Sequence, residues 1–457
     1  MHRYYAITPI LFLVLFVGYS LAEEKALSLN YQKTSLENGL KVIMVEHHEL
    51  PTVAVELLVR AGSAHDLPGR EGLAHLVSST LLEGTTRRTS QGISEEIDFI
   101  GGTLRTDCDY DSTSITATSL KRDLPTILDL ITDVARHPSF PPEELERQRD
   151  KATTAILRER DDKAAIARRH FHEMLYAGHP YDHPPLGTLE GVKTVTREEV
   201  LEFHKRHYLP GNSILVVVGD IEPGPTLEEL RRSFGDLSGE VQSQPAPPAL
   251  LPQTGQRIRL IDKPDLTQTE IRIGHLGIDR ASPEYFPLLL LNRILGVGPT
   301  SRLYTRLRAE RGLTYSVRSQ FDARKQKGPF VISTYTKNET TLETLQLLLE
   351  ELKRLKKEGI TSEELQGAKA YFAGHFPLNI ETPAQIASQL LEQEFYGLPE
   401  GYLENYIKNI QAVTLQEVNS AAARFLDPNN ILIVLVSKAE EVLEKVKTLG
   451  EVELKGL

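Results

Sequence analysis

Residues 72–85 read GLAHLVSSTLLEGT, an apolar run of helical character from which the rest of the chain can be interpreted. The run carries one histidine, His75, and Ser78 and Ser79 follow it one turn later. Two histidines four residues apart lie on one face of a helix and can bind Zn²⁺, with a glutamate between them as general base. Serine is a poor zinc ligand and a poor base, because its hydroxyl is hardly ionised near neutral pH. This helix therefore offers one metal ligand and no base.

The run resembles the zinc-binding helix of the insulinase (pitrilysin) metallopeptidases, whose usual text is GLAHFLEHMLFKGT and whose inverted motif is His-x-x-Glu-His. His75 matches the first histidine, Ser78 stands at the glutamate position, and Ser79 stands at the second histidine position. The resemblance maps the family's third ligand, a glutamate on a later helix, onto Glu159. These four positions mark a vestigial zinc site, and no metal is expected on this chain. From the residues alone, His75 also suits a packed histidine and Glu159 a solvated helix face.

A second segment resembles the same family. Residues 296–317 read GVGPTSRLYTRLRAERGLTYSV, close to the family text GGG-x-SSRLF-x-x-LRE-x-x-GL-x-YSV. Active family members carry an arginine and a tyrosine here that bind the substrate backbone and steady the tetrahedral intermediate. The matching residues are Arg308 and Tyr315. Arginine presents a planar fork of donors to carbonyl oxygens, and a tyrosine hydroxyl can donate to a developing oxyanion. The residue types alone also fit an exposed helix face and a packed strand.

Length, charge and cysteine content limit the function classes. A chain of 457 residues suggests about two to four domains. The net charge of −11 and the absence of a basic patch argue against a nucleic-acid partner. The single cysteine, Cys108, excludes an intrachain disulfide.

The N-terminus has the features of a secretory signal peptide. Basic residues His2 and Arg3 precede an apolar run, residues 7–17, that is short for a membrane span. A small-x-small cleavage site then ends at Ala22. We therefore expect residues 1–22 to be removed, which predicts a periplasmic or secreted protein with no stable membrane span. An uncleaved anchor is the alternative.

Three pairs of similar segments indicate an internal duplication. In chain order they are residues 140–145 and 360–365, residues 174–180 and 394–399, and residues 194–221 and 412–438. Their common order predicts two copies of a domain of about 200 residues. A Pro-rich stretch without apolar periodicity, residues 239–256, is typical of a semi-rigid linker. The predicted lobes are residues 23–238 and 257–457.

Apolar periodicity and turn residues predict the elements within each lobe. The expected strands are residues 36–47, with an Asn-Gly turn, residues 52–63, a hairpin over 103–120, and two strands around a turn over 257–278. The expected helices are residues 72–82, 93–100, 124–134, 142–167, 283–295, 340–357 and 363–376. The resemblance implies an α+β fold of two homologous lobes, each a mostly antiparallel sheet with helices on one face, which close as a clamshell.

Four histidines gather near the middle of the chain. They are His170, His172, His179 and His183, around a Pro- and Gly-rich stretch, residues 171–188, that predicts a loop. Such histidines are usually surface or turn residues. A compensating metal site in this loop is the alternative.

Some exported bacterial members of the family, and the mitochondrial processing peptidase, work as pairs in which only one subunit carries His-x-x-Glu-His. This chain resembles the other subunit, because it has lost the zinc motif and kept Arg308 and Tyr315. The prediction is a non-catalytic, substrate-binding subunit of a heteromeric zinc endopeptidase, with zinc in the partner and peptides or unfolded segments as substrates. Two alternatives stay open: a structural or peptide-binding protein without proteolytic role, and a metallopeptidase with a rearranged metal site.

Overall fold

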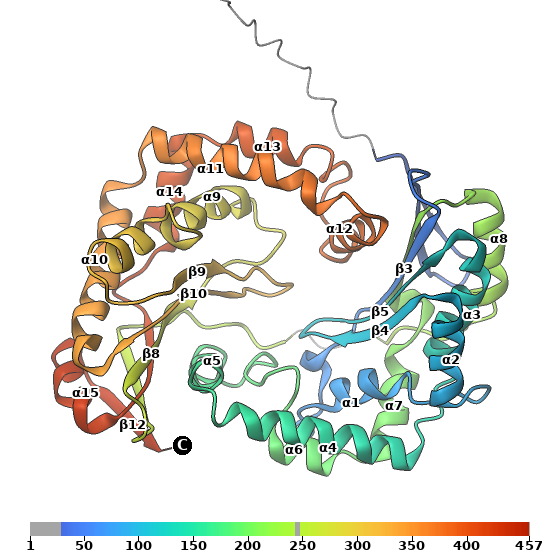
Figure 1. The fold of residues 1–457 in the computed structure, drawn as a ribbon, viewed down its shortest axis with the longest axis horizontal. Helices are drawn as coiled ribbons and strands as arrows, with labels where there is room; N and C mark the ends of the chain where they lie inside the picture. The colour runs from blue at the N-terminus through green and yellow to red at the C-terminus, as the bar shows by residue number, and fades with distance from the viewer. Residues whose placement is uncertain (1–28, 243–246, 457) are drawn as a thin grey trace, which may run out of the picture.

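A computed structural model of the chain describes residues 29–242 and 247–456, which form a ring of two lobes (Figure 1). The predicted signal peptide, residues 1–22, lies outside these residues, as does part of the predicted linker. No helix in the described ranges is long and apolar enough to cross a membrane.

The N-terminal lobe is built on a six-stranded sheet. Its strands are β1 (Tyr31–Ser35), β2 (Lys41–Glu46), β3 (Thr52–Val59), β4 (Thr103–Cys108), β5 (Thr113–Leu120) and β6 (Ser213–Gly219). They lie in the order β1-β2-β6-β3-β5-β4, and β2 and β6 are the parallel pair. The expected Asn-Gly turn joins β1 to β2, and the expected hairpin of residues 103–120 is formed by β4 and β5.

The C-terminal lobe repeats this plan. Its strands are β7 (Arg257–Asp262), β8 (Gln268–Leu276), β9 (Val317–Phe321), β10 (Pro329–Lys337), β11 (Leu432–Ser437) and β12 (Val452–Gly456). They lie in the order β12-β7-β11-β8-β10-β9, the same order as in the first sheet except that β12 takes the edge held there by β1. The two strands expected over residues 257–278 are present, but β11 lies between them, so they do not pair with each other.

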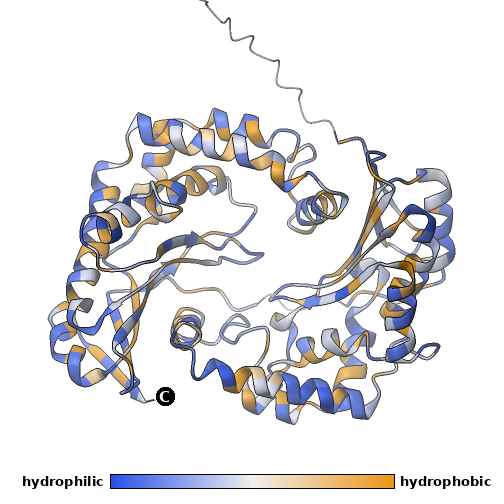
Figure 2. Cartoon of the chain, in the orientation of Figure 1, coloured by the Kyte–Doolittle hydropathy of each residue, from blue (hydrophilic) through white to orange (hydrophobic). Residues whose placement is uncertain are grey.

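Helices cover the outer face of each sheet. In the first lobe they are α1 (Leu73–Thr80), α2 (Ser90–Ile100), α3 (Leu124–Arg136), α4 (Pro142–Glu159), α6 (Leu189–Thr194), α7 (Arg197–His207) and α8 (Pro223–Phe234). In the second lobe they are α9 (Tyr285–Gly296), α10 (Thr341–Glu358), α11 (Ser362–His375), α13 (Tyr406–Ala412), α14 (Leu415–Phe425) and α15 (Ala439–Val446). Figure 2 shows hydrophobic and hydrophilic residues alternating along these helices, as amphipathic helices on a sheet require. The α+β clamshell of two similar lobes is thus confirmed.

The two lobes exchange a helix. Helix α5 (Lys163–Leu175), which follows the first lobe's α4, packs on β8 and β11 of the second sheet. Helix α12 (Pro383–Phe395) of the second half packs on β3 and β6 of the first sheet. Both helices lie inside the ring (Figure 1). The expectation of helices on one face only was therefore wrong, because each sheet buries its inner face under a helix from the other half.

This exchange also explains two errors in the predicted elements. The helix expected over residues 142–167 breaks at Arg160, and Asp162 begins α5 by accepting a 2.8 Å hydrogen bond from the Ala164 N–H. The break turns the chain from one lobe toward the other. The loop expected from residue 171 begins later, because α5 continues to Leu175 and carries His170 and His172.

Candidate functional site

The frame of the candidate site is α1, an apolar helix buried against its own lobe. Leu73, Ala74, Leu76 and Val77 are buried and hold α1 in the first lobe's core. The helix begins at Gly72, whose φ of 107° lies in the left-handed region that favours glycine.

Asp66 stabilises the start of this helix. Its Oδ2 accepts a hydrogen bond from the Gly72 N–H at 2.6 Å, and its Oδ1 accepts one from the Ala74 N–H at 2.7 Å. A carboxylate at a helix N-terminus satisfies main-chain donors that have no partner within the helix. Burial raises the pKa of Asp66 to about 7, and the two main-chain hydrogen bonds act in the opposite direction. No local sequence pattern indicates this role, because Asp66 lies six positions before Gly72.

A later segment closes on the same helix end. Gly187, with φ of 89°, approaches so closely that a Cβ there would lie 2.5 Å from the Gly72 Cα and 2.2 Å from the Glu71 carbonyl oxygen. The neighbouring Thr188 N–H donates to that carbonyl oxygen at 3.3 Å. Gly187, within the stretch PPLGT of residues 184–188, is therefore required by the close approach of two main chains.

The motif positions themselves lie on α1 without forming a metal site. Ser78 is 2% exposed, and its carbonyl oxygen accepts a 2.9 Å hydrogen bond from the Thr106 hydroxyl on β4. The Ser79 hydroxyl donates at 3.3 Å to the Leu76 carbonyl of its own helix. His75 is half-buried, and burial lowers its pKa, which the nearby Asp107 partly offsets.

Glu159 is likewise engaged in a protein contact. It is the last residue of α4, and its Oε1 accepts a 2.8 Å hydrogen bond from the Arg168 guanidinium on α5. Within residues 29–242 and 247–456, no three His, Cys, Asp or Glu side chains gather so that they could hold a metal ion. A zinc site generally needs three protein ligands of these types. The described residues therefore do not fit a zinc ion at α1.

The four histidines near α5 have separate surroundings. The His172 Nδ1 lies 2.8 Å from the Tyr110 hydroxyl, and the His170 Nδ1 lies 2.9 Å from the Glu173 carboxylate. His179 Nδ1 accepts from the Tyr181 N–H at 3.1 Å, and His183 Nδ1 lies 3.1 Å from the Pro184 carbonyl oxygen. The alternative of a compensating metal site among these histidines has no support in this geometry.

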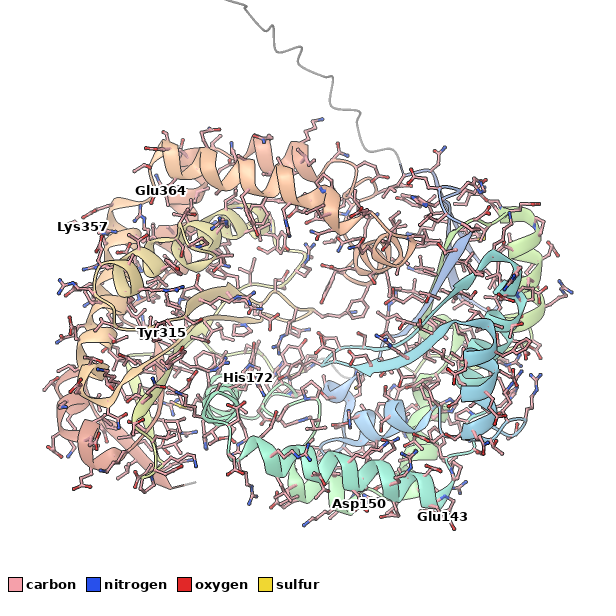
Figure 3. All side chains as sticks on the ribbon, in the orientation of Figure 1. Glu143, Asp150, His172, Tyr315, Lys357 and Glu364 are labelled. Carbon is pink, nitrogen blue, oxygen red and sulfur yellow. The ribbon has the colours of Figure 1, made fainter. Side chains whose placement is uncertain are left out.

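Arg308 and Tyr315 lie on the second lobe, before β9. Arg308 belongs to a short π-helical stretch, η4 (Tyr304–Ala309), and its guanidinium stands 4.7 Å from the centre of the Tyr304 ring. Tyr315 is 77% exposed and precedes β9 (Figure 3). Within residues 29–242 and 247–456, no hydrogen bond, ion pair or ring contact joins either residue to His75, which lies on the other lobe. Both side chains are available for contact with another molecule.

Loss of the Asp66 carboxylate should weaken the frame. We expect Asp66→Ala to lower the free energy of unfolding by about 2 kcal/mol, because two buried N–H groups lose their acceptor. Urea denaturation followed by circular dichroism measures the change. Asp98→Ala, on the exposed side of α2, is the matched control and should change little. Equal effects of the two substitutions would contradict a capping role for Asp66.

Comparisons of the whole chain with known proteins agree with one another. The family model described as Insulinase (Peptidase family M16) matches residues 41–189, and the one described as Peptidase M16 inactive domain matches residues 194–372. An uncharacterized zinc protease of Mycobacterium leprae is 29% identical over 409 residues, which are 89% of this chain and 92% of the relative. One from Rickettsia bellii is 27% identical over 416 residues, which are 88% of this chain and 98% of the relative.

Solved structures give the same result. The crystal structure of a peptidase M16 inactive domain from Pseudomonas fluorescens superposes with a TM-score of 0.84 at 28% identity, covering 93% of this chain and 100% of that one. A protease from Helicobacter pylori shares the fold, with a TM-score of 0.82 at 21% identity over 90% of this chain and 100% of that one. The two family models together cover most of the chain, and its two lobes share one strand order. This chain therefore belongs to the insulinase family, peptidase family M16.

Proposed function

We propose that this chain is the non-catalytic, substrate-binding subunit of a heteromeric zinc endopeptidase. A partner of the same family, carrying His-x-x-Glu-His, would supply the zinc ion and the general base. The observation that carries the proposal is the contrast within α1: the capped helix and its glycine contacts are kept, while two of the three residues that would handle zinc are Ser78 and Ser79. A peptidase frame with an incomplete set of zinc ligands and no general base suits a subunit that binds substrate and leaves the chemistry to its partner.

The sheet edge beside α1 is suited to hold an extended peptide. Among the described residues β4 pairs only with β5, so the main-chain groups on its other side face no strand. The Thr106 hydroxyl ties β4 to α1, which places this edge next to the vestigial motif. An extended peptide can add to such an edge through main-chain hydrogen bonds, which accept many sequences. Peptides and unfolded segments are therefore the proposed substrates.

Arg308 and Tyr315 are the proposed contribution to the partner's chemistry. Both are exposed, and within the described residues the Arg308 guanidinium lies over the Tyr304 ring and makes no ion pair. An arginine and a tyrosine that are free of intramolecular ion pairs can reach a substrate carbonyl held beside a zinc ion in another subunit. Their exposure supports this role, because a buried pair would serve packing instead.

Substitution of this pair tests the proposal. We expect Arg308→Ala or Tyr315→Phe to lower kcat/KM of the reconstituted complex about a hundredfold, the usual loss when one donor to a developing oxyanion is removed. Cleavage of an internally quenched peptide by this chain together with its catalytic partner gives the rate. Arg311→Ala, which removes a neighbouring exposed arginine, is the control and should leave the rate unchanged.

The alternatives predict different outcomes. A structural or peptide-binding protein would leave the partner's rate unchanged when Arg308 or Tyr315 is replaced. A metallopeptidase with a rearranged site would bind one zinc per chain and cleave the peptide alone. The exported location and cleavage after Ala22 remain predictions from the sequence.

A further inference from the structure

A cavity lies where α5 meets the second sheet and the turn between β4 and β5. Its volume is about 370 Å³, in the range of small ligand pockets. The first half contributes Tyr110, Glu159, Pro184–Leu186 and the α5 residues, and the second half contributes residues of β8, β9 and β10 and of the turn after β9. His172, labelled on α5 in Figure 3, is among its lining residues. The cavity therefore adjoins the vestigial ligand Glu159 and contacts both halves of the chain.

The lining is more basic than the chain as a whole. Four arginines and two carboxylates face this cavity in a protein whose net charge is −11. Arg168 is paired with Glu159 at 2.8 Å, and Arg324 is paired with Asp322 at 2.6 Å. Arg169, the third, lies 3.7 Å from the Glu173 carboxylate on α5. The fourth is Arg272 of β8.

Arg272 has no partner of its own. Over the described residues its guanidinium makes no hydrogen bond and no ion pair, its buried Nε has no acceptor, and the carboxylates of Glu270 and Asp162 act on it only through space. Burial lowers the pKa of Arg272 to about 10, repulsion from Arg168 adds to this effect, and attraction to Glu270 and Asp162 partly opposes it. A half-buried guanidinium whose buried N–H has no acceptor is better satisfied when another molecule supplies one. Arg272 thus points to an anion that is not part of this chain.

Arg324 has a further free donor in the same cavity. Its Nε and Nη2 donate to the Asp322 carboxylate, while its buried Nη1 has no acceptor. The side chain is 9% exposed and is held 4.0 Å from the centre of the Tyr110 ring, so its direction is fixed. His172, next to these arginines, is buried and carries a pKa lowered to about 3, first by burial and then by the arginine charges. The cavity is therefore a fixed, positively charged surface with two unmet arginine donors.

We propose that Arg272 and Arg324 bind a carboxylate of the substrate peptide in this cavity. Guanidinium groups match carboxylate oxygens in geometry and charge, and the two unmet N–H groups would gain acceptors. The carboxylate is either an acidic side chain or the C-terminus of the peptide. This inference rests on the proposed peptide-binding function and adds to it a preference for peptides that present a carboxylate to this cavity. Because both halves line the cavity, a bound carboxylate would also link the two lobes.

The test uses the full chain and labelled peptides. The probes are three fluorescein-labelled alanine hexapeptides: one with a central glutamate and an amidated end, one with glutamine and an amidated end, and one with glutamine and a free C-terminal carboxylate. Fluorescence anisotropy gives each dissociation constant. We expect the glutamate peptide, the free-carboxylate peptide, or both to bind about tenfold more tightly than the neutral peptide, as a charge-assisted hydrogen bond implies. Whichever of these two peptides binds more tightly shows whether the site takes an acidic side chain or the C-terminal carboxylate of a peptide.

Substitution of Arg272 then locates the site. Arg272→Met keeps the apolar stem and removes the charge, so it should abolish the preference for the carboxylate. Arg318 is an exposed arginine of β9, the edge strand of the same sheet, and does not line the cavity. Arg318→Met removes the same charge and should keep the preference. Thermal unfolding should show that Arg272→Met is no less stable than the unsubstituted protein, because an unpaired buried cation does not stabilise the fold.

Three outcomes would overturn the inference, and they differ in meaning. Equal affinity of the unsubstituted protein for all three peptides would reject the carboxylate site and leave peptide binding intact. No binding of any peptide would reject the proposed function and this inference with it. A carboxylate preference that survives Arg272→Met but not Arg318→Met would place the site elsewhere on the second sheet. The comparison among peptides needs no variant, so it holds even where a substitution impairs folding.

Discussion

Phe171→Ala should lower the free energy of unfolding by about 3 to 5 kcal/mol, the usual cost of removing a buried aromatic ring. Phe171 lies on α5 and is fully buried between that helix and the second sheet. A Cβ at Gly274 of β8 would lie 3.0 Å from the Phe171 Cζ, so the ring sits directly on this strand. The substitution would open a cavity at the surface through which the first half holds the second.

The matched control is the same substitution at an exposed site. Phe99, on α2, is 92% exposed, and Phe99→Ala should change stability by less than about 0.5 kcal/mol. Chemical denaturation followed by circular dichroism compares the two variants with the unsubstituted protein. If Phe171→Ala proves as mild as Phe99→Ala, the exchanged helix does not hold the halves together.

Local sequence patterns predicted most helices and strands. They did not predict that α5 and α12 each pack on the sheet of the other lobe. The hairpin of β4 and β5, and helices such as α3 and α10, follow from periodicity and turn residues close in sequence. The contact between α5 and β11 joins residues far apart in the chain, and a single sequence does not specify which sheet an apolar helix covers. The continuous helical pattern over residues 142–167 also hid the break before Asp162, because charged residues at that break suit a helix surface equally well.

The candidate site also contains residues that the sequence predicts and residues that only the fold reveals. His75, Ser78 and Ser79 are predicted from a short segment that resembles a family text, and Glu159 from the family's later helix glutamate. The structure has the first three on α1 and Glu159 at the end of α4. Asp66, Arg272 and Arg324 were missed, because their roles depend on partners brought close only by the fold. An arginine in a strand has no sequence feature that distinguishes an unpaired buried cation from a paired one.

Acid should destabilise the protein through His172. This side chain is buried, and its pKa is lowered to about 3 by burial and by Arg324, Arg272 and Arg168. The unfolded chain has an ordinary histidine pKa of 6.5, so it binds a proton more readily than the folded protein does. The neutral ring therefore contributes its full stability above pH 6.5. That contribution is lost as the pH falls from about 6.5 toward 3, by up to about 5 kcal/mol in total.

A difference between variants isolates this residue from the other buried histidines. His172→Gln retains a side chain that can bond to the Tyr110 hydroxyl but has no titrating group, so its stability should fall less between about pH 6.5 and 4. His375→Gln, on the exposed end of α11, should keep the slope of the unsubstituted protein. Urea midpoints measured across this range give both slopes. Identical slopes for His172→Gln and the unsubstituted protein would mean that His172 is protonated in the folded state near its ordinary pKa. Burial and the nearby arginine charges would then not lower the pKa of His172, and the cavity beside it would be less positive than its four arginines imply.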